Sequence, residues 1–264
     1  MMVQRNKDWF WPAVLGAGIL LAIGAIGLYL ARDDAPLPEP VVDVPQPAAE
    51  TPVAPRPAVV TEPAPPPART LPLPPLDESD PEVVGGLTEI LGPDAVMQHI
   101  VPERLVRNIV VSIDNASRQQ MAANQRPLQP TTGEFLTAGE EDSLVIAPEN
   151  FARYEPFVAL VSNLDAKTVV SFYRGLEPLF QQAYEDLGHP DASFNERLNE
   201  IIEHLLQTPT PRGEIALVQP SVLYKYADER LERLSAGQKL LIRMGVDNAT
   251  VIKGKLREIQ AELL

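Results

Sequence analysis

The sequence predicts a mainly α-helical, multi-helix globular domain with a minor β-hairpin, preceded by one transmembrane helix and a disordered proline-rich linker. Three observations predict it: an uncharged apolar run over residues 10–30, a proline-dense stretch over residues 31–76, and apolar residues at helical spacing over residues 77–264. A short tail, residues 1–9, precedes the apolar run.

The apolar run from Phe10 to Leu30 has the length of a membrane span. It holds 21 residues without a charge, and a bilayer core about 30 Å thick needs about 20 helical residues. A cleaved signal peptide, which is the alternative, has a shorter apolar region and a small-x-small cleavage site. Bulky Tyr29 stands where cleavage after Ala31 would need a small residue, so we expect an uncleaved anchor.

The charges beside this run predict its orientation. Arg5 and Lys7 precede it, whereas Arg32 follows it together with two aspartates. Because positive charge stays in the cytoplasm, we expect a cytoplasmic N-terminus and an exported C-terminal domain, held by a single span.

The linker is dominated by proline from Ala35 to Leu76. Proline fixes its own backbone angle, lacks a donor and biases the preceding residue toward extended conformations. We expect a disordered chain with polyproline II character, which fully extended would reach about 130 Å. Its role is a tether or a docking track for aromatic grooves. The tether is favoured, because few basic residues flank the prolines and no motif repeats.

Prolines and a glycine predict the first helices of the domain. Asp80 is expected to cap a helix with Pro81 at its first position, and Gly92 ends that helix. Two further helices are expected to start at Pro93 and Pro102, and the second has one apolar face (Leu105, Ile109, Ile113 and Ala116).

A β-hairpin is predicted next. An apolar pair at residues 135–136 and an apolar triplet at residues 144–146 flank a polar turn at residues 139–142. Ile215–Val218 is a second candidate strand.

The most periodic helical patterns lie between these strands. Apolar residues of the segment 151–164 share one face, and a longer helix follows the candidate cap Asp165 and ends at Gly188. Pro178 lies inside the longer helix and is predicted to kink it or split it.

Four more helices are expected in the rest of the chain. Ser193–Glu196 is a capping box, and the helix it starts stops at Pro209. Residues 224–234 form a second helix by the spacing of their apolar residues. Ser235 starts a third, and Asp247 caps the terminal one.

Charge excludes some classes of partner. The net charge is −14, which argues against nucleic-acid binding and against tight contact with anionic lipid. Residues 77–214 carry 23 acidic and 9 basic residues, whereas residues 215–264 carry 6 and 8. The basic residues of the last segment form either a face for an acidic partner or, as we favour, solvated helix faces that pair locally (Lys225, Arg230, Arg233, Lys239, Arg243, Lys253, Lys255 and Arg257).

No catalytic residue, cofactor site or metal site is predicted. The chain has no cysteine, which excludes disulfides, zinc–thiolate sites and cysteine nucleophiles. Phosphate-loop, dinucleotide, nucleophile-elbow and HExxH motifs do not occur. The histidines His99, His189 and His204 lack a second ligand at helical spacing, so we interpret them as structural or surface residues.

Two other patterns leave chemistry open. Acids such as Glu149, Glu155 and Asp165 become a glycosidase-like pair only at a measured separation. The polar-aromatic clusters at residues 153–154 and 224–226 would suit a groove, but we favour amphipathic side chains that bridge core and water.

Several segments resemble a known family (Phe151–Tyr154, Leu176–Leu179, Ala183–Gly188, His204–Pro209, Tyr226–Glu232 and Ala236–Gly245). They are similar to an uncharacterised proteobacterial family whose members have an N-terminal membrane anchor, a proline-rich stretch and a C-terminal domain of unknown function. The resemblance implies an inner-membrane bacterial protein, and it implies no activity, cofactor or catalytic residue.

The sequence therefore predicts a membrane-anchored cell-envelope protein, a protein-interaction or scaffolding module held on a proline-rich stalk beside an envelope partner. One alternative is a carboxylate-dependent cell-wall hydrolase. Another is a proline-rich linker protein that spans the periplasm, which is disfavoured because the membrane run has no ionisable residue to couple to a proton channel. The oligomeric state and the identity of the partner stay open.

Overall fold

The computed structural model describes residues 72–119, 125–131, 133–140, 143–220 and 223–264. Within them, no helix is both long enough and apolar enough to cross a membrane. The predicted anchor and almost all of the proline-rich linker lie outside the described residues, so both stay predictions.

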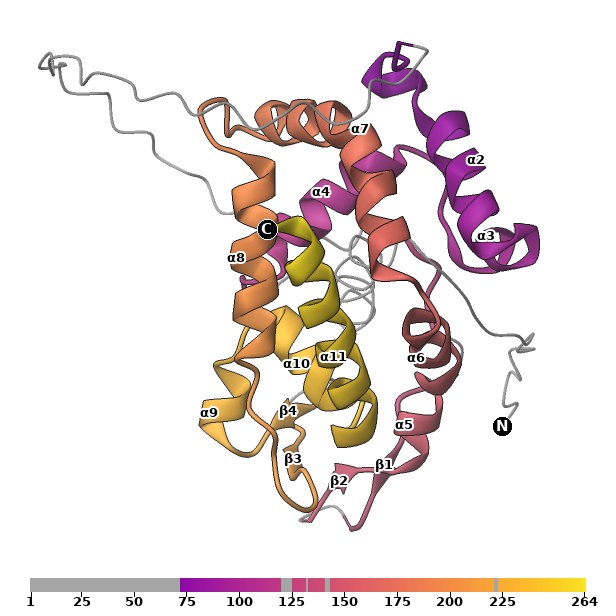
Figure 1. The fold of residues 1–264 in the computed structure, drawn as a ribbon. Helices are drawn as coiled ribbons and strands as arrows, with labels where there is room; N and C mark the ends of the chain where they lie inside the picture. The colour runs from indigo at the N-terminus through magenta and orange to yellow at the C-terminus, as the bar shows by residue number, and fades with distance from the viewer. Residues whose placement is uncertain (1–71, 120–124, 132, 141–142, 221–222) are drawn as a thin grey trace, which may run out of the picture.

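The described chain is mainly α-helical with two short antiparallel hairpins, which confirms the predicted fold class for this part (Figure 1). Its elements are η1 (Leu76–Glu78), α2 (Asp80–Leu91), α3 (Pro93–His99), α4 (Leu105–Asn115), β1 (Thr137–Ala138), β2 (Val145–Ile146), α5 (Glu149–Ala152), α6 (Glu155–Ser162), α7 (Ala166–Asp186), α8 (Phe194–Leu206), β3 (Leu217–Val218), β4 (Lys225–Tyr226), α9 (Glu229–Glu232), α10 (Ala236–Arg243) and α11 (Val246–Leu263).

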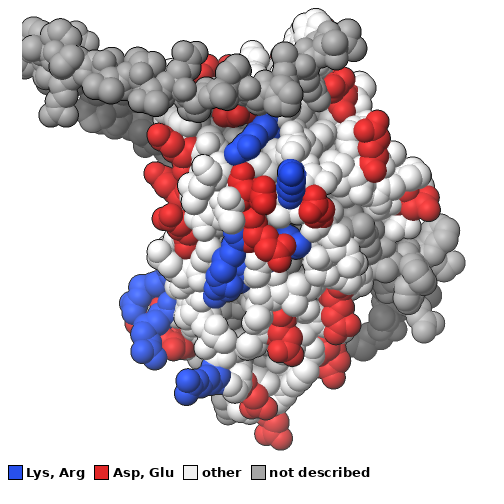
Figure 2. Space-filling model, viewed as in Figure 1, with Lys and Arg blue, Asp and Glu red and all other residues white. Residues whose placement is uncertain are grey.

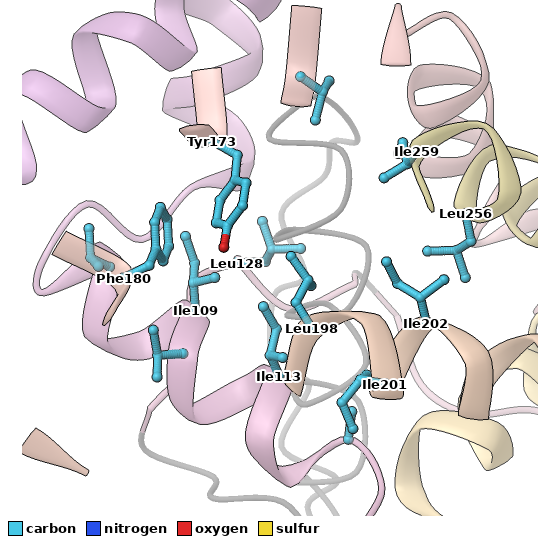
Figure 3. Packing of buried hydrophobic residues seen from close by; sticks show 14 of the residues in the cluster. Ile109, Ile113, Leu128, Tyr173, Phe180, Leu198, Ile201, Ile202, Leu256 and Ile259 are labelled. Carbon is cyan, nitrogen blue, oxygen red and sulfur yellow. The ribbon is translucent and has the colours of Figure 1, made fainter. Parts of the chain in front are cut away.

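The main hydrophobic core lies where α4, α7, α8 and α11 meet. Tyr173 and Phe180 of α7 lie beside Ile109 of α4, and Leu198 of α8 closes the same layer (Figure 3). Ile259 extends the core along α11. All five side chains are nearly inaccessible to water, so the apolar faces read from the sequence are the faces that pack.

The second half of the fold repeats the order of elements in the first half. A hairpin, a four-residue helix, an eight-residue helix and a long helix occur as β1–β2–α5–α6–α7 and again as β3–β4–α9–α10–α11. Four pairs of equivalent elements begin 80 positions apart (Thr137 and Leu217, Val145 and Lys225, Glu149 and Glu229, Ala166 and Val246). We refer to residues 137–186 as the first unit and to residues 217–263 as the second unit.

The two hairpins join these units. In the first hairpin Thr137 pairs with Ile146, and in the second Leu217 pairs with Tyr226. The inner strands also meet, because Ile146 N donates to Ile215 O at 3.0 Å and Leu217 N donates to Leu144 O at 2.8 Å. A small second core, which includes Ile146, Leu217 and Tyr226, lies under this junction.

The predicted caps Asp165 and Ser193 are confirmed, and Ser235, predicted as the start of a helix, caps α10. The side chains of Asp165, Ser193 and Ser235 accept hydrogen bonds from backbone N–H groups in the first turns of α7, α8 and α10. Each satisfies a donor that a helix N-terminus leaves without an intrahelical partner.

Two other predicted caps are wrong. Asp80 lies inside α2, whose N-cap is Ser79, and its carboxylate instead accepts hydrogen bonds from the backbone N–H groups of Arg104 and Leu105 at the start of α4. Asp247 lies in the first turn of α11, because the helix begins directly after Gly245.

Pro178 lies inside α7, which stays one helix and bends in Figure 1, so a kink rather than a split is the outcome. Two other helix predictions need correction. The helix expected over residues 151–164 is two, α5 and α6, since Pro156 in the first turn of α6 cannot donate the bond that a continuous helix needs. The helix expected over residues 224–234 begins as strand β4, because Leu217 and its neighbour pair with this segment.

Candidate functional site

A groove opens where the N-terminus of α11 meets the loop that follows α8. It contains a cavity of about 90 Å³ between α10, α11 and the loop that leads to β3. That loop contacts α11, because Lys253 Nζ donates to Thr208 O. We call it the α10–α11 groove, and its lining residues are Phe151, Thr208, Pro209, Thr210, Pro211, Gly213, Ile215, Leu241, Ile242, Gly245, Val246, Ala249, Thr250 and Lys253.

Gly245 makes the junction between α10 and α11 possible. Its φ of 83° lies in the left-handed region, and a Cβ atom there would lie 2.8 Å from the ring of Phe151. Asn248 fixes the same corner, since its Nδ2 donates to the backbone carbonyls of Phe151 and Met244, both at 2.9 Å. An aromatic ring of the first unit therefore packs against the backbone of the second unit at the groove.

The two units differ at this junction. Asp165 precedes α7 and accepts hydrogen bonds from Thr168 N at 2.8 Å and Thr168 Oγ1 at 2.7 Å. The equivalent position before α11 is Gly245, which has no side chain to cap that helix. The first turn of α11 lines the groove, and its backbone N–H groups carry partial positive charge.

Lys253 adds a full positive charge. Its Nζ donates to the carbonyl of Thr208 at 2.5 Å, so the ammonium group bridges α11 and the loop after α8. Burial lowers the pKa of Lys253, and the nearby guanidinium of Arg257 lowers it further. Sequence analysis missed this arrangement, because Lys253 and Thr208 lie 45 positions apart.

This arrangement is suited to binding an apolar group beside a negative one. Leu241, Ile242, Val246 and Ala249 supply apolar walls, and Val246 is 47 % exposed. A cavity of about 150 Å³ holds one benzene molecule, so the smaller cavity here has room for about one aliphatic side chain. The groove is therefore a place for one anchoring side chain of a larger ligand.

The three histidines lie in three different environments. His99 ends α3, its Nε2 has no hydrogen-bond partner among the described residues, and burial lowers its pKa from 6.5 to about 4. His189 stacks on Tyr184 with ring centroids 4.5 Å apart. His204 Nε2 lies 2.8 Å from Ser235 Oγ. In the part of the chain that the structure describes, no three His, Cys, Asp or Glu side chains form a group that could hold a metal ion.

The acids singled out in the sequence begin helices. Glu149 and Glu155 lie in the first turns of α5 and α6, and Asp165 caps α7. The pKa of Asp165 is lowered, chiefly by the hydrogen bonds from Thr168, and that of Asp228 is lowered by those from Arg230. A general acid needs a raised pKa, so the lowered pKa values of Asp165 and Asp228 suit helix caps rather than general acids.

The polar-aromatic clusters bridge core and water. Tyr154 and Tyr226 are buried, and Tyr226 OH donates to Lys239 O at 3.1 Å. Arg153 reaches outward and donates to Gly133 O at 2.9 Å. No residue of either cluster lines the groove, although Phe151, two positions before Arg153, does.

Four of the eight basic residues of the last segment pair with nearby acids in the described structure (Arg230, Arg233, Lys239 and Lys255). Lys239 pairs with Glu232 at 2.8 Å, and Arg230 and Arg233 pair with acids on either side of the start of α9. Figure 2 shows blue and red side chains interspersed on this face of the molecule, without a continuous basic area.

These observations define a helical domain with a repeated hairpin–helix unit and an apolar groove that carries the cation Lys253. The chain belongs to the DUF3014 family, described as a protein of unknown function, whose model matches residues 105–260. No curated protein and no solved structure matches the chain. Membership in an uncharacterised family confirms that part of the resemblance, while the proteobacterial origin and the anchor stay predictions.

Proposed function

We propose that this chain is a membrane-anchored cell-envelope protein whose helical domain binds a segment of a partner protein in the α10–α11 groove. The observation that carries the proposal is the groove itself: a narrow apolar cavity, open to solvent, with Lys253 on its wall. Protein interfaces concentrate their binding energy in such pockets, where one buried side chain anchors the partner.

The envelope location rests on the sequence. The uncharged run of residues 10–30 is long enough to span a bilayer, and the positive charge before it favours export of the domain. The proline-rich stretch that follows would hold the domain away from the membrane. An interaction module on such a stalk can reach partners that a domain resting on the bilayer cannot.

Site-directed photo-crosslinking tests the groove. A photoreactive phenylalanine derivative replaces Thr250, an exposed residue that lines the groove. The matched control replaces Ala192, an exposed residue in the loop before α8, about 20 Å away at the other end of that helix. We expect an adduct with another protein in living cells from position 250 only. Equal adducts from both positions, or none, would contradict the proposal.

Cysteine labelling tests the location. The chain has no cysteine, and Ser143 is exposed in the turn between β1 and β2, so Ser143→Cys gives one reporter thiol. We expect an impermeant maleimide to label it in cells permeable only at the outer membrane. Labelling that occurs only after lysis, with the denatured protein as positive control, would place the domain in the cytoplasm and overturn the envelope proposal.

A further inference from the structure

Lys253, which is partly buried, differs from the two buried lysines of the second unit. Lys239 pairs with Glu232 at 2.8 Å, and Lys255 pairs with Glu258 at 2.5 Å. Among the described residues, the ion pairs include no acid on Lys253, whose Nζ reaches only a backbone carbonyl. A half-buried ammonium group favours a carboxylate partner.

The groove therefore selects a ligand with two properties. Its apolar walls and small cavity accept about one aliphatic side chain. The ammonium group of Lys253, with the guanidinium of Arg257 near enough to lower its pKa, favours a negative charge beside that side chain. A segment with a carboxylate flanked by valines has this chemistry.

This chain itself contains such a segment. Residues 41–45 read Val-Val-Asp-Val-Pro, in a stretch, residues 35–71, that has four acids and two bases. Residues 77–214 carry a net charge of −14 and repel it, whereas residues 215–264 carry +2. Four of the eight basic residues there pair locally, so the attraction for an acidic segment comes from Lys253 at the groove and from the nearby Arg257.

We propose that the α10–α11 groove binds this chain's own segment Val41–Pro45, with a valine side chain in the apolar cavity and the carboxylate of Asp43 on Lys253. The proposal rests on the groove being a peptide-binding site, as proposed above. It makes the proline-rich stretch an intramolecular competitor of the partner segment. A partner would have to displace it, and displacement would lengthen the stalk between domain and membrane.

The length of chain between the segment and the domain permits this contact. Asp43 lies 29 positions before residue 72, where the described structure begins. A proline-rich chain of that length extends to about 90 Å at about 3.1 Å per residue, and a domain of this size is about 40 Å across. The chain can therefore place Asp43 at the groove, and its attachment to the same molecule raises the local concentration of the segment there.

Crosslinking in the full chain, in membranes, tests the proposal. The double variant Val44→Cys/Thr250→Cys is treated with a short bis-maleimide, and Val44→Cys/Ala192→Cys is the matched control. We expect the intramolecular product of the first pair to exceed that of the control by about tenfold. Asp43→Asn or Lys253→Gln is expected to lower it about fivefold, whereas Glu62→Gln, which changes another acid of the linker, leaves it unchanged.

A charge reversal separates pairing from nonspecific effects. The single variants Asp43→Lys and Lys253→Asp are expected to lose the product, and the double reversal is expected to restore it. Equal crosslinking of the two cysteine pairs, an unchanged yield in Asp43→Asn, or a product between two chains would overturn the proposal. If position 250 still captures another protein in cells, only the intramolecular contact fails and the proposed function stands.

Discussion

Arg197 binds both the side chain and the backbone of Asp114. Its Nε lies 3.1 Å from Asp114 Oδ1, and its Nη2 donates to the Asp114 carbonyl at 2.8 Å. The contact joins the first turn of α8 to the last turn of α4, where a cation also complements the helix dipole. The two residues lie 83 positions apart, so no local pattern in the sequence announces the pair.

Removal of Asp114 should destabilise the fold. The Asp114 side chain is only 5 % exposed, and its loss leaves the partly buried Arg197 without its carboxylate. We expect Asp114→Ala to lower the free energy of unfolding by about 2–3 kcal/mol, measured by urea denaturation. Arg118, which also pairs with Asp114 but is 59 % exposed, is the control, and Arg118→Ala should cost less than about 1 kcal/mol. Equal decreases in the free energy of unfolding for the two variants would contradict a larger contribution from the buried contact between Asp114 and Arg197.

His99 should make stability depend on pH. Burial lowers its pKa from 6.5 to about 4, so between these values the unfolded chain binds a proton that the folded chain does not. The stability contributed by neutral His99 is therefore complete above about pH 6.5 and decreases as the pH falls toward 4. After a discount for partial exposure, we expect about 1–2 kcal/mol. The free energy of unfolding of His99→Gln should decrease less between pH 7 and pH 4.5 than that of the unsubstituted chain. An equal decrease in both would contradict this role of His99.

Gly245 and Gly254 should respond oppositely to the same substitution. At Gly245, φ is 83° and an added Cβ would lie 2.8 Å from the Phe151 ring, so Gly245→Ala should cost about 2–4 kcal/mol. Gly254 lies inside α11 with no atom within 4 Å of an added Cβ, so Gly254→Ala should stabilise the helix by about 0.5–1 kcal/mol. Thermal unfolding of both variants measures the difference. A destabilised Gly254→Ala would mean that this face of α11 is covered in solution.

Local signals predicted the helices well, and long-range contacts explain what they missed. Caps such as Asp165 and Ser193 act within three residues, so the sequence shows them directly. The apolar spacing of residues 224–234 predicts a helix, but Lys225 and Tyr226 form strand β4. Pairing with β3 stabilises this strand, and so does the carboxylate of Glu232, which accepts a hydrogen bond from Tyr226 N. The groove was missed for the same reason, since Phe151 reaches Gly245 only in the folded chain.

Asp80 and Asp247 should contribute unequally to stability, because their carboxylates have different partners in the folded chain. Both precede a helical pattern and were predicted to be caps, yet Asp80 accepts bonds of 2.7 and 2.8 Å from the N–H groups of Arg104 and Leu105, and thus supports the start of α4 from 24 positions away. Asp247 lies exposed in the first turn of α11, where the helix dipole favours its negative charge. We expect Asp80→Ala to cost about 1–2 kcal/mol and Asp247→Ala less than about 1 kcal/mol in chemical denaturation.

Because Arg104 has a left-handed φ of 51°, loss of its bond to Asp80 should also loosen this turn. Faster amide hydrogen exchange at residues 104 and 105 in Asp80→Ala, with the α11 amides unchanged, would locate the effect at α4, and uniform exchange throughout the chain would contradict it.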